Sequence, residues 1–291
     1  MEWTSTFANN SIFVLSASRP GEVGVARRLM EDLEQIRIAT HAVHLERHDI
    51  ATRQELICCL RNIARAAKKG VRPILHLDMH GDDRRGLEIP ASQEFAAWRD
   101  VNSWLQKINI SSKNNLCVVA AACFGLNLIA PISVLKPVPF YCLIASRSSI
   151  ELGYVERNIV PFYRVLLQQG SLQQAIQEIN KHFELFHCEK MLAITLARYI
   201  KTACKGSALR GRTERLITEA LAAGTPRSKE SLRQLRRFLR ANLQPSDELV
   251  KRYAERFLIG KSFSVSLDEI IRLVDQPQER SRTRHSGVSL I

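Results

Sequence analysis

The first 200 residues of the chain alternate between short strand-like runs and helix-like segments, and this alternation limits the possible folds more than any other feature. The most strand-like run is Leu116–Ala122, in which small apolar residues follow one another without a polar interruption. Such a run is typical of a central strand that is covered on both faces. Strands separated by helices predict an α/β sandwich of three layers, with a mostly parallel sheet between two layers of helices.

The individual elements follow from the spacing of apolar residues. Runs rich in β-branched and aromatic residues, or alternating in polarity, predict strands at Ser11–Ala17, Thr40–Leu45, Pro73–Met79, Leu116–Ala122 and Phe140–Ala145. Apolar residues three or four positions apart predict helices at Glu22–Ile36, Thr52–Lys69, Ser92–Ile108, Phe162–Gln169, Leu172–Phe186 and Glu189–Lys201.

The pattern changes after Lys205, where strand-like runs stop and basic amphipathic segments begin. Helices are expected at Leu209–Ala222, Lys229–Asn242, Asp247–Leu258 and Leu267–Val274. We therefore expect an α/β domain over residues 1–204 and an all-helical domain over 205–275. Residues 276–291 contain few apolar anchors and are expected to form a mobile tail.

The charge of the chain is concentrated in the same C-terminal region. The chain has 42 Lys and Arg against 29 Asp and Glu, a net charge of +13, and residues 205–291 carry +8 of it. Within this region, Leu232–Arg240 interleaves apolar and basic residues. The pattern fits an ordinary amphipathic helix, and it also fits a surface for an acidic ligand, a partner protein or nucleic acid.

The cysteines and the absence of long apolar runs bear on the compartment. No run approaches the ~18 apolar residues of a membrane span, and the N-terminus lacks the features of a signal peptide. The seven cysteines are odd in number, most lie in apolar runs, and none forms a Cys-x-x-Cys pair. We therefore expect a cytoplasmic protein without disulfides, structural zinc or another cofactor.

Two predicted strands end in residues that could carry chemistry. One continues into His80 and Gly81, and the other, 43 residues later, continues into Cys123 and Gly125. Neighbouring parallel strands would bring His80 and Cys123 to one edge of the sheet, where an imidazole can activate a thiol nucleophile. The glycines would let a substrate backbone approach closely, and the N–H groups of Gly81 and Cys123 are candidates for an oxyanion hole.

These residues resemble the caspase-like cysteine peptidases. The family signature is Q-A-C-[RQG]-G with a histidine about 50 residues upstream, and Ala121–Gly125 keeps the Ala-Cys-x-Gly part, whereas Ala121 replaces the Gln and Phe124 follows the cysteine. The resemblance covers about residues 11–200. Further similar segments are the loop at Ser18–Gly21, the hairpin at Gly86–Ile89, and a helix pair like that of bacterial CHAT-type members from Phe162 to Ile176.

The resemblance implies a cysteine endopeptidase that cleaves protein or peptide substrates with His80 and Cys123. It also implies a caspase-like version of the three-layer sandwich. Bacterial relatives are often effectors of antiviral defence or regulated cell death, so an activating protein or small-molecule signal is expected. For substrate binding, Arg19 matches a caspase arginine that binds an acidic residue. Other members bind basic residues through a pocket carboxylate, which Asp82 or Glu151 could supply.

Two other functions remain open at this point. The chain could be a non-catalytic caspase-like module that binds a protein partner or nucleic acid through its basic helices. It could also be a metal hydrolase, because His76, Asp78 and His80 alternate along one strand and share one face. Asp78 could alternatively be a hydrogen-bonded interior group that orients a histidine.

Overall fold

The structure is a computed structural model, and it describes residues 8–19, 25–40 and 44–275. The expected tail at 276–291 lies outside the described residues, as do Pro20 and Gly21. The chain divides into two compact units. The first comprises the described residues up to Lys190 together with Arg256–Lys261, and the second comprises Met191–Glu255 and the described residues from Ser262 onward.

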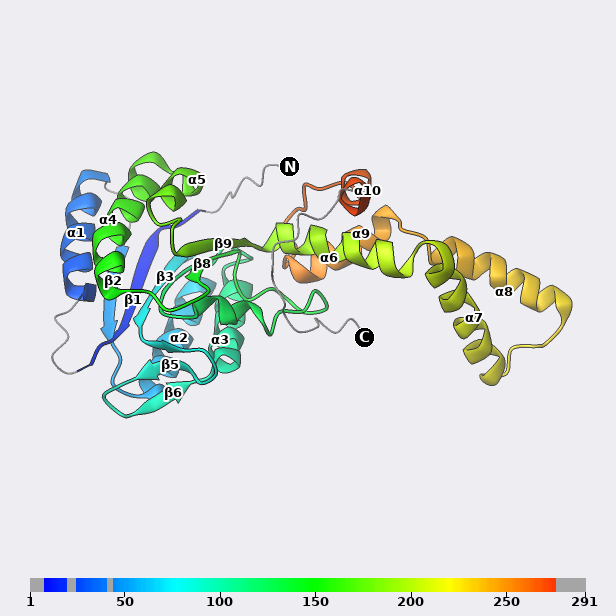
Figure 1. The fold of residues 1–291 in the computed structure, drawn as a ribbon, viewed down its shortest axis with the longest axis horizontal. Helices are drawn as coiled ribbons and strands as arrows, with labels where there is room; N and C mark the ends of the chain where they lie inside the picture. The colour runs from blue at the N-terminus through cyan, green and yellow to red at the C-terminus, as the bar shows by residue number, and fades with distance from the viewer. Residues whose placement is uncertain (1–7, 20–24, 41–43, 276–291) are drawn as a thin grey trace. The chain divides into compact units, whose positions relative to one another are not determined.

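The first unit is built on a six-stranded sheet with the strand order β2-β1-β3-β7-β8-β9 (Figure 1). The strands are β1 (Ser11–Ala17), β2 (His44–Asp49), β3 (Pro73–Met79), β7 (Cys117–Ala121), β8 (Cys142–Ser146) and β9 (Phe183–His187). Neighbouring strands are parallel except β9, which runs antiparallel to β8 at the edge. The expected α/β fold with a mostly parallel sheet is therefore confirmed.

Two pairs of helices cover the faces of this sheet. α1 (Val25–Thr40) packs beside α4 (Leu152–Gln169), and α2 (Arg53–Lys68) packs beside α3 (Trp98–Ser111). Figure 1 shows the two pairs on opposite sides of the sheet, which gives three layers. The short elements are η1 (Gly125–Ile129), α5 (Leu172–Ala175) and η2 (Ile176–Glu178).

Local sequence explains why these elements form where they do. At the start of α2, the Thr52 side chain accepts the Glu55 N–H while Glu55 accepts the Thr52 N–H, so two otherwise unpaired donors are satisfied. The same helix buries Leu56 and Leu60 on its inner face. All of β7 is buried, as its uninterrupted apolar sequence predicts.

A small antiparallel sheet follows β3 directly. It contains β4 (Gly81–Asp82), β5 (Gly86–Ile89) and β6 (Glu94–Ala96) in sequence order. Because β6 takes up residues that were expected to be helical, α3 begins at Trp98 and not at Ser92. The hairpin of β4 and β5 starts at Gly81, the residue after His80.

The described residues after 204 contain helices and no strands, as expected. These helices are α7 (Gly206–Ala222), α8 (Lys229–Asn242), α9 (Asp247–Phe257) and α10 (Leu267–Asp275), and they follow α6 (Cys188–Ala203). α7 packs against α8, and Arg236 of α8 pairs with Glu214 of α7 at 3.4 Å. Within the described part of the chain, no helix is long and apolar enough to cross a membrane.

Two expected elements were wrong. The helix expected over Leu172–Phe186 ends early, and Phe183–His187 forms strand β9, because pairing with β8 stabilises an extended conformation there. The strand expected over Thr40–Leu45 begins at His44, because α1 continues to Thr40. β2 is an edge strand rich in charged residues, so it lacks the apolar pattern of an interior strand.

Candidate active site

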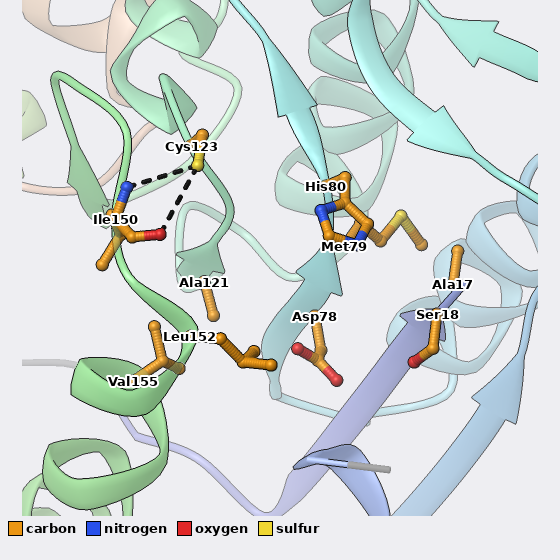
Figure 2. Close-up of a pocket in the computed structure, with 10 residues that line it drawn as sticks. All are labelled: Ala17, Ser18, Asp78, Met79, His80, Ala121, Cys123, Ile150, Leu152 and Val155. Atoms are coloured by element: carbon orange, nitrogen blue, oxygen red, sulfur yellow. Dashed lines mark hydrogen bonds between the residues drawn. The ribbon is translucent and has the colours of Figure 1, made fainter. Parts of the chain in front are cut away.

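His80 and Cys123 lie at the same edge of the sheet, as their positions after two neighbouring parallel strands predict. His80 follows the last residue of β3, and Cys123 comes two residues after the end of β7. The register pairs Asp78 with Ala121, so both strands end at the same level. His80 and Cys123 line one pocket of about 80 Å³, and Figure 2 shows them on opposite sides of it.

The backbones that carry the two side chains are in close contact. A Cβ atom added to Gly81 would lie 1.9 Å from the Cys123 carbonyl oxygen and 3.0 Å from its carbonyl carbon. Gly81 therefore admits the backbone of Cys123, and not the substrate backbone that the sequence suggested. Gly125 has a similar structural role, since an added Cβ would lie 3.0 Å from the Ala120 Cβ and 3.2 Å from the Ala145 Cβ.

The Cys123 thiol is held by the loop that follows β8. The Ile150 N–H donates to Cys123 Sγ at 3.3 Å, and the thiol lies 3.8 Å from the Ile150 carbonyl oxygen (Figure 2). The next residue, Phe124, has φ of 58° and donates its N–H to Ser148 at 3.1 Å. A bulky residue in this left-handed region costs energy, so the surrounding loop holds the turn that presents Cys123.

The N–H groups expected to form an oxyanion hole can be examined through their backbone hydrogen bonds. The Glu88 N–H donates to the His80 carbonyl at 2.9 Å. In an antiparallel pair of strands, hydrogen-bonded and non-hydrogen-bonded residue pairs alternate, so the next pair, Gly81 and Leu87, is not hydrogen-bonded. The Gly81 N–H therefore faces away from β5. Among the described residues, the Cys123 N–H makes no backbone hydrogen bond. Neither group is therefore used by the small sheet.

Asp78 supplies a carboxylate to the same pocket. It lines the cavity and is only 9% exposed, and Ser16 Oγ donates to it at 3.3 Å. Burial raises the pKa of Asp78 to about 6, against the lowering effects of the Ser16 hydrogen bond and of nearby His80. Figure 2 shows the Asp78 side chain below His80, on the side of the pocket that Ser18 also lines.

Arg19 does not line this pocket. Its guanidinium pairs with Glu88 of β5 at 2.8 Å, and 53% of its side chain is exposed. Ser18, the residue before it, is the one that contributes to the pocket. Arg19 is therefore paired with the small sheet, and it lies next to the pocket in which the resemblance expected it to bind substrate.

The two carboxylates proposed from sequence to bind a basic residue are also outside the pocket. Asp82 accepts the backbone N–H groups of Arg84 and Arg85 at 3.0 and 2.7 Å. These hydrogen bonds lower the pKa of Asp82, and the one from Arg85 has the larger effect. The Asp82 carboxylate is therefore already bound within the hairpin turn. Glu151 is exposed and precedes α4, while its neighbours Ile150 and Leu152 line the pocket.

The metal-site alternative fails on geometry. His76 is buried and its Nδ1 lies 3.1 Å from the Tyr163 hydroxyl, on the side of α4. Burial lowers the pKa of His76 to about 3, so the ring is neutral. In the part of the chain that the structure describes, no three His, Cys, Asp or Glu side chains gather closely enough to hold a metal ion.

The sequence patterns missed the contribution of the β8 loop. Ile150 contacts the thiol, and Ser16 donates to Asp78 from the neighbouring strand β1. In the sequence, Ser16 stands out only as a polar residue near the end of a mostly apolar strand. Ile150 stands out only because it follows a strand that lies next to β7 in the sheet.

No protein-family model matches the chain, and no curated protein matches it.

Proposed function

We propose that the first unit is a caspase-like cysteine endopeptidase in which Cys123 is the nucleophile and His80 the acid–base residue. The observation that carries this proposal is that His80 and Cys123 line one pocket. Gly81, the residue after His80, packs directly against the Cys123 backbone. A thiol and an imidazole at one sheet edge, next to two suitable N–H groups, are the components of acyl transfer. A direct hydrogen bond between them would form with substrate, because such bonds are often long in the free enzyme.

In the proposed mechanism, His80 takes the proton of the Cys123 thiol and the thiolate attacks the carbonyl carbon of a peptide bond. The Gly81 and Cys123 N–H groups stabilise the negative oxygen of the tetrahedral intermediate. His80 then protonates the leaving amine as the carbon–nitrogen bond breaks, which leaves an acyl-enzyme. Water, deprotonated by His80, attacks this thioester and releases the acid product and the thiol.

The pocket carboxylate favours a basic residue before the scissile bond. Asp78 is buried in the pocket that His80 and Cys123 line, and its pKa of about 6 leaves it mostly ionised at pH 7 to 8. A buried carboxylate attracts an ammonium or guanidinium group and repels an acidic side chain. The cavity of about 80 Å³ is also far below the roughly 300–1,000 Å³ of small-molecule sites, which suits one side chain of a peptide.

The test is cleavage of a peptide library by the full chain and by the Cys123→Ala variant. The wild-type protein should cleave after Lys or Arg, and Cys123→Ala should reduce cleavage by about 10³-fold or more with an unchanged circular dichroism spectrum. Cys58→Ala is the matched control, because Cys58 is a half-buried thiol on α2, remote from the pocket, and should leave cleavage unchanged. Equal cleavage by Cys123→Ala would refute the proposal.

A second candidate function is a non-catalytic binding module. It is favoured by α8, in which no residue is buried and Phe238 is 62% exposed among arginines. Polynucleotide binding with a steep dependence on salt, together with no cleavage of the library, would favour this function over the peptidase. The defence role and an activating partner rest on the sequence resemblance alone.

A further inference from the structure

The opposite edge of the central sheet carries a larger cavity, of about 520 Å³. It lies where the chain enters β3 and β7, since Arg72 precedes β3 and Asn115 lies two residues before β7. The loop after α3 contributes Lys113, and the segment after α9 contributes Ile259 and Lys261. All of these residues belong to the first unit.

The charged groups that line this cavity are all basic. They are Lys68, Arg72, Lys113 and Lys261, and no Asp or Glu lines it. Among the residues that the structure describes, Lys68, Arg72 and Lys113 form no ion pair. Cations gathered around a concavity create a positive potential that concentrates anions.

Helix ends explain only part of this arrangement. Lys68 lies in the last turn of α2, and Lys113 lies just after α3, where a helix dipole favours a cation. Arg72 leads into a strand, and Lys261 lies four residues beyond the end of α9, so neither is placed by a helix end. Their positions in the cavity require another reason.

The backbone around the cavity has its own partners. The Gly70 N–H donates to Ala67, and the Lys113 N–H donates to Ile110. The Lys261 N–H donates to Leu258. The Ser111 and Ser112 hydroxyls donate to the carbonyls of Lys107 and Asn109, so they too are already used. An anion would therefore be bound through the basic side chains.

The segment 258–261 closes one side of the cavity in an unusual conformation. Ile259 has φ of 59°, a region that costs energy for a β-branched residue, and Gly260 follows with φ of 75°. The Lys261 ammonium lies 3.4 Å from the centre of the Tyr141 ring, and burial lowers the pKa of Lys261. The nearby Glu189 carboxylate opposes part of this lowering, so Lys261 already has an anionic neighbour.

We propose that this cavity binds a nucleotide-sized small molecule that carries two or more phosphate groups. Lys68, Arg72 and Lys113 together carry more charge than one phosphate neutralises, since a phosphate carries about −1.5 to −2 at pH 7. The volume lies in the range of small-molecule sites, and Val71 and Ile259 give an apolar lining for an organic group. A concave site of this size suits a small ligand better than a polynucleotide, which needs an extended basic stripe. The site is independent of the proposed peptidase reaction.

The site also has a route to the second unit along the chain. Residues 256–261 belong to the first unit, while the residues before and after them belong to the second. A ligand in this cavity therefore contacts the segment from which the chain continues into the helical unit. Binding is expected to change hydrogen exchange in α9 as well as at the cavity.

The test is calorimetric titration of the full chain with inorganic tripolyphosphate and with ATP. Wild-type protein should bind both saturably, with Kd below about 1 mM. Arg72→Glu/Lys113→Glu should weaken binding by at least about 30-fold, since each charge-assisted contact contributes roughly tenfold or more. The matched control is Arg164→Glu/Lys181→Glu, which changes the net charge equally at exposed residues outside the cavity and should alter binding by less than about threefold.

Three results would overturn the proposal. They are no binding below 1 mM, an equal loss in the control variant, and tighter binding of a 20-nucleotide single strand that the cavity variant abolishes. If the charge reversals prevent folding, Arg72→Gln/Lys113→Gln replaces them, with Arg164→Gln/Lys181→Gln as control. Cleavage of the peptide library is measured without ligand, and it tests only the proposed peptidase. Titration with tripolyphosphate and ATP tests only the basic cavity, so either proposal can fail while the other holds.

Discussion

The two edges of the central sheet are built from the same strands, yet they differ in size, charge and the origin of their side chains. At the carboxyl edge, β3 and β7 end in a small pocket with a buried carboxylate, an imidazole and a thiol. At the amino edge, the same two strands begin beside a cavity more than six times larger, lined by four cations. The carboxyl edge is organised by short, packed turns, and the amino edge by loops and helix ends.

This difference fits the two proposals, which assign a reaction to one edge of the sheet and binding to the other. The proposed reaction requires atoms in fixed contact, and the backbone contact at Gly81 together with the strained Phe124 turn gives such contact. Binding of a polyanion requires only accumulated charge in a sufficiently large space. Substitutions at the carboxyl edge should therefore have large, local effects on cleavage.

The largest effect is expected from His80→Ala. Loss of the acid–base residue should lower kcat/KM for a cleavable peptide by about 10²–10⁴-fold, because proton transfer to the leaving amine is no longer assisted. The control is His44→Ala, since 65% of the His44 side chain is exposed on the edge strand β2. Steady-state kinetics measure both, and a similar loss in the two variants would mean that His80 has no special role.

Gly81→Ala should affect both cleavage and stability. The added Cβ would overlap the Cys123 carbonyl, so the free energy of unfolding should fall by about 1–3 kcal/mol and cleavage should be lost with it. Gly211→Ala is the control, because nothing lies within 4 Å of an added Cβ there and the helix should become more stable by about 0.5–1 kcal/mol. Denaturant titration reports the stability, and a fully active, stable Gly81→Ala protein would contradict the described backbone contact.

Asp78→Asn should separate stability from activity. The folded-state pKa of about 6 lies above the ordinary 3.8, so the folded protein binds the proton more tightly and the wild type loses stability as pH rises from about 4 to 6. Removing the buried charge should therefore stabilise the variant at pH 7.5, by about 2–3 kcal/mol, with little difference at pH 4. Thermal unfolding at both pH values measures this effect.

The same variant should lose its preference for basic substrates. The ratio of kcat/KM for an Arg peptide to that for its neutral citrulline isostere should fall by about 10- to 100-fold in Asp78→Asn. Asp83→Asn, a change of the same type at an exposed residue of the hairpin, should keep the wild-type ratio. An unchanged ratio in Asp78→Asn would place the specificity carboxylate elsewhere.

The smallest effect is expected from Arg19→Ala. Its ion pair with Glu88 is largely exposed, so the variant should lose less than about 1 kcal/mol of stability and change kcat/KM for an Arg peptide by less than about threefold. Kinetics on matched Arg and Asp peptides measure the result. Efficient wild-type cleavage after Asp that disappears in Arg19→Ala would instead restore the caspase-type role for Arg19.

Sequence patterns predicted the parts of the fold that local forces determine. β3 and α8 have the expected bounds, Pro73–Met79 and Lys229–Asn242, because one is a buried apolar run and the other an amphipathic helix with a Ser228 cap. β9 could not be predicted in this way, since its extended conformation depends on pairing with β8. The start of β2 was misplaced for a related reason, because an exposed edge strand needs no apolar alternation.

The candidate site also has parts that local sequence predicts and parts that depend on long-range packing. Placing His80 and Cys123 at one edge needed only the order of strands and the rule for parallel sheets. The spacing already placed Asp78 on the same face of the strand as His80. That Asp78 lines the pocket, and that Asp82 and Glu151 do not, depends on how the loops after β3 and β8 pack. The basic cavity combines residues from near 70, 113 and 260, and no local pattern links segments so distant in sequence.

The central claim is that Cys123 and His80 act together in one pocket, and covalent labelling tests it most directly. The full chain is treated with a peptidyl acyloxymethyl ketone that carries Arg next to the reactive group, and the adducts are mapped by mass spectrometry. We expect one adduct, on Cys123, which should form at least about 100-fold more slowly in His80→Ala. Labelling of Cys58 or Cys59 at the same rate as Cys123, or equal rates at Cys123 with and without His80, would contradict it.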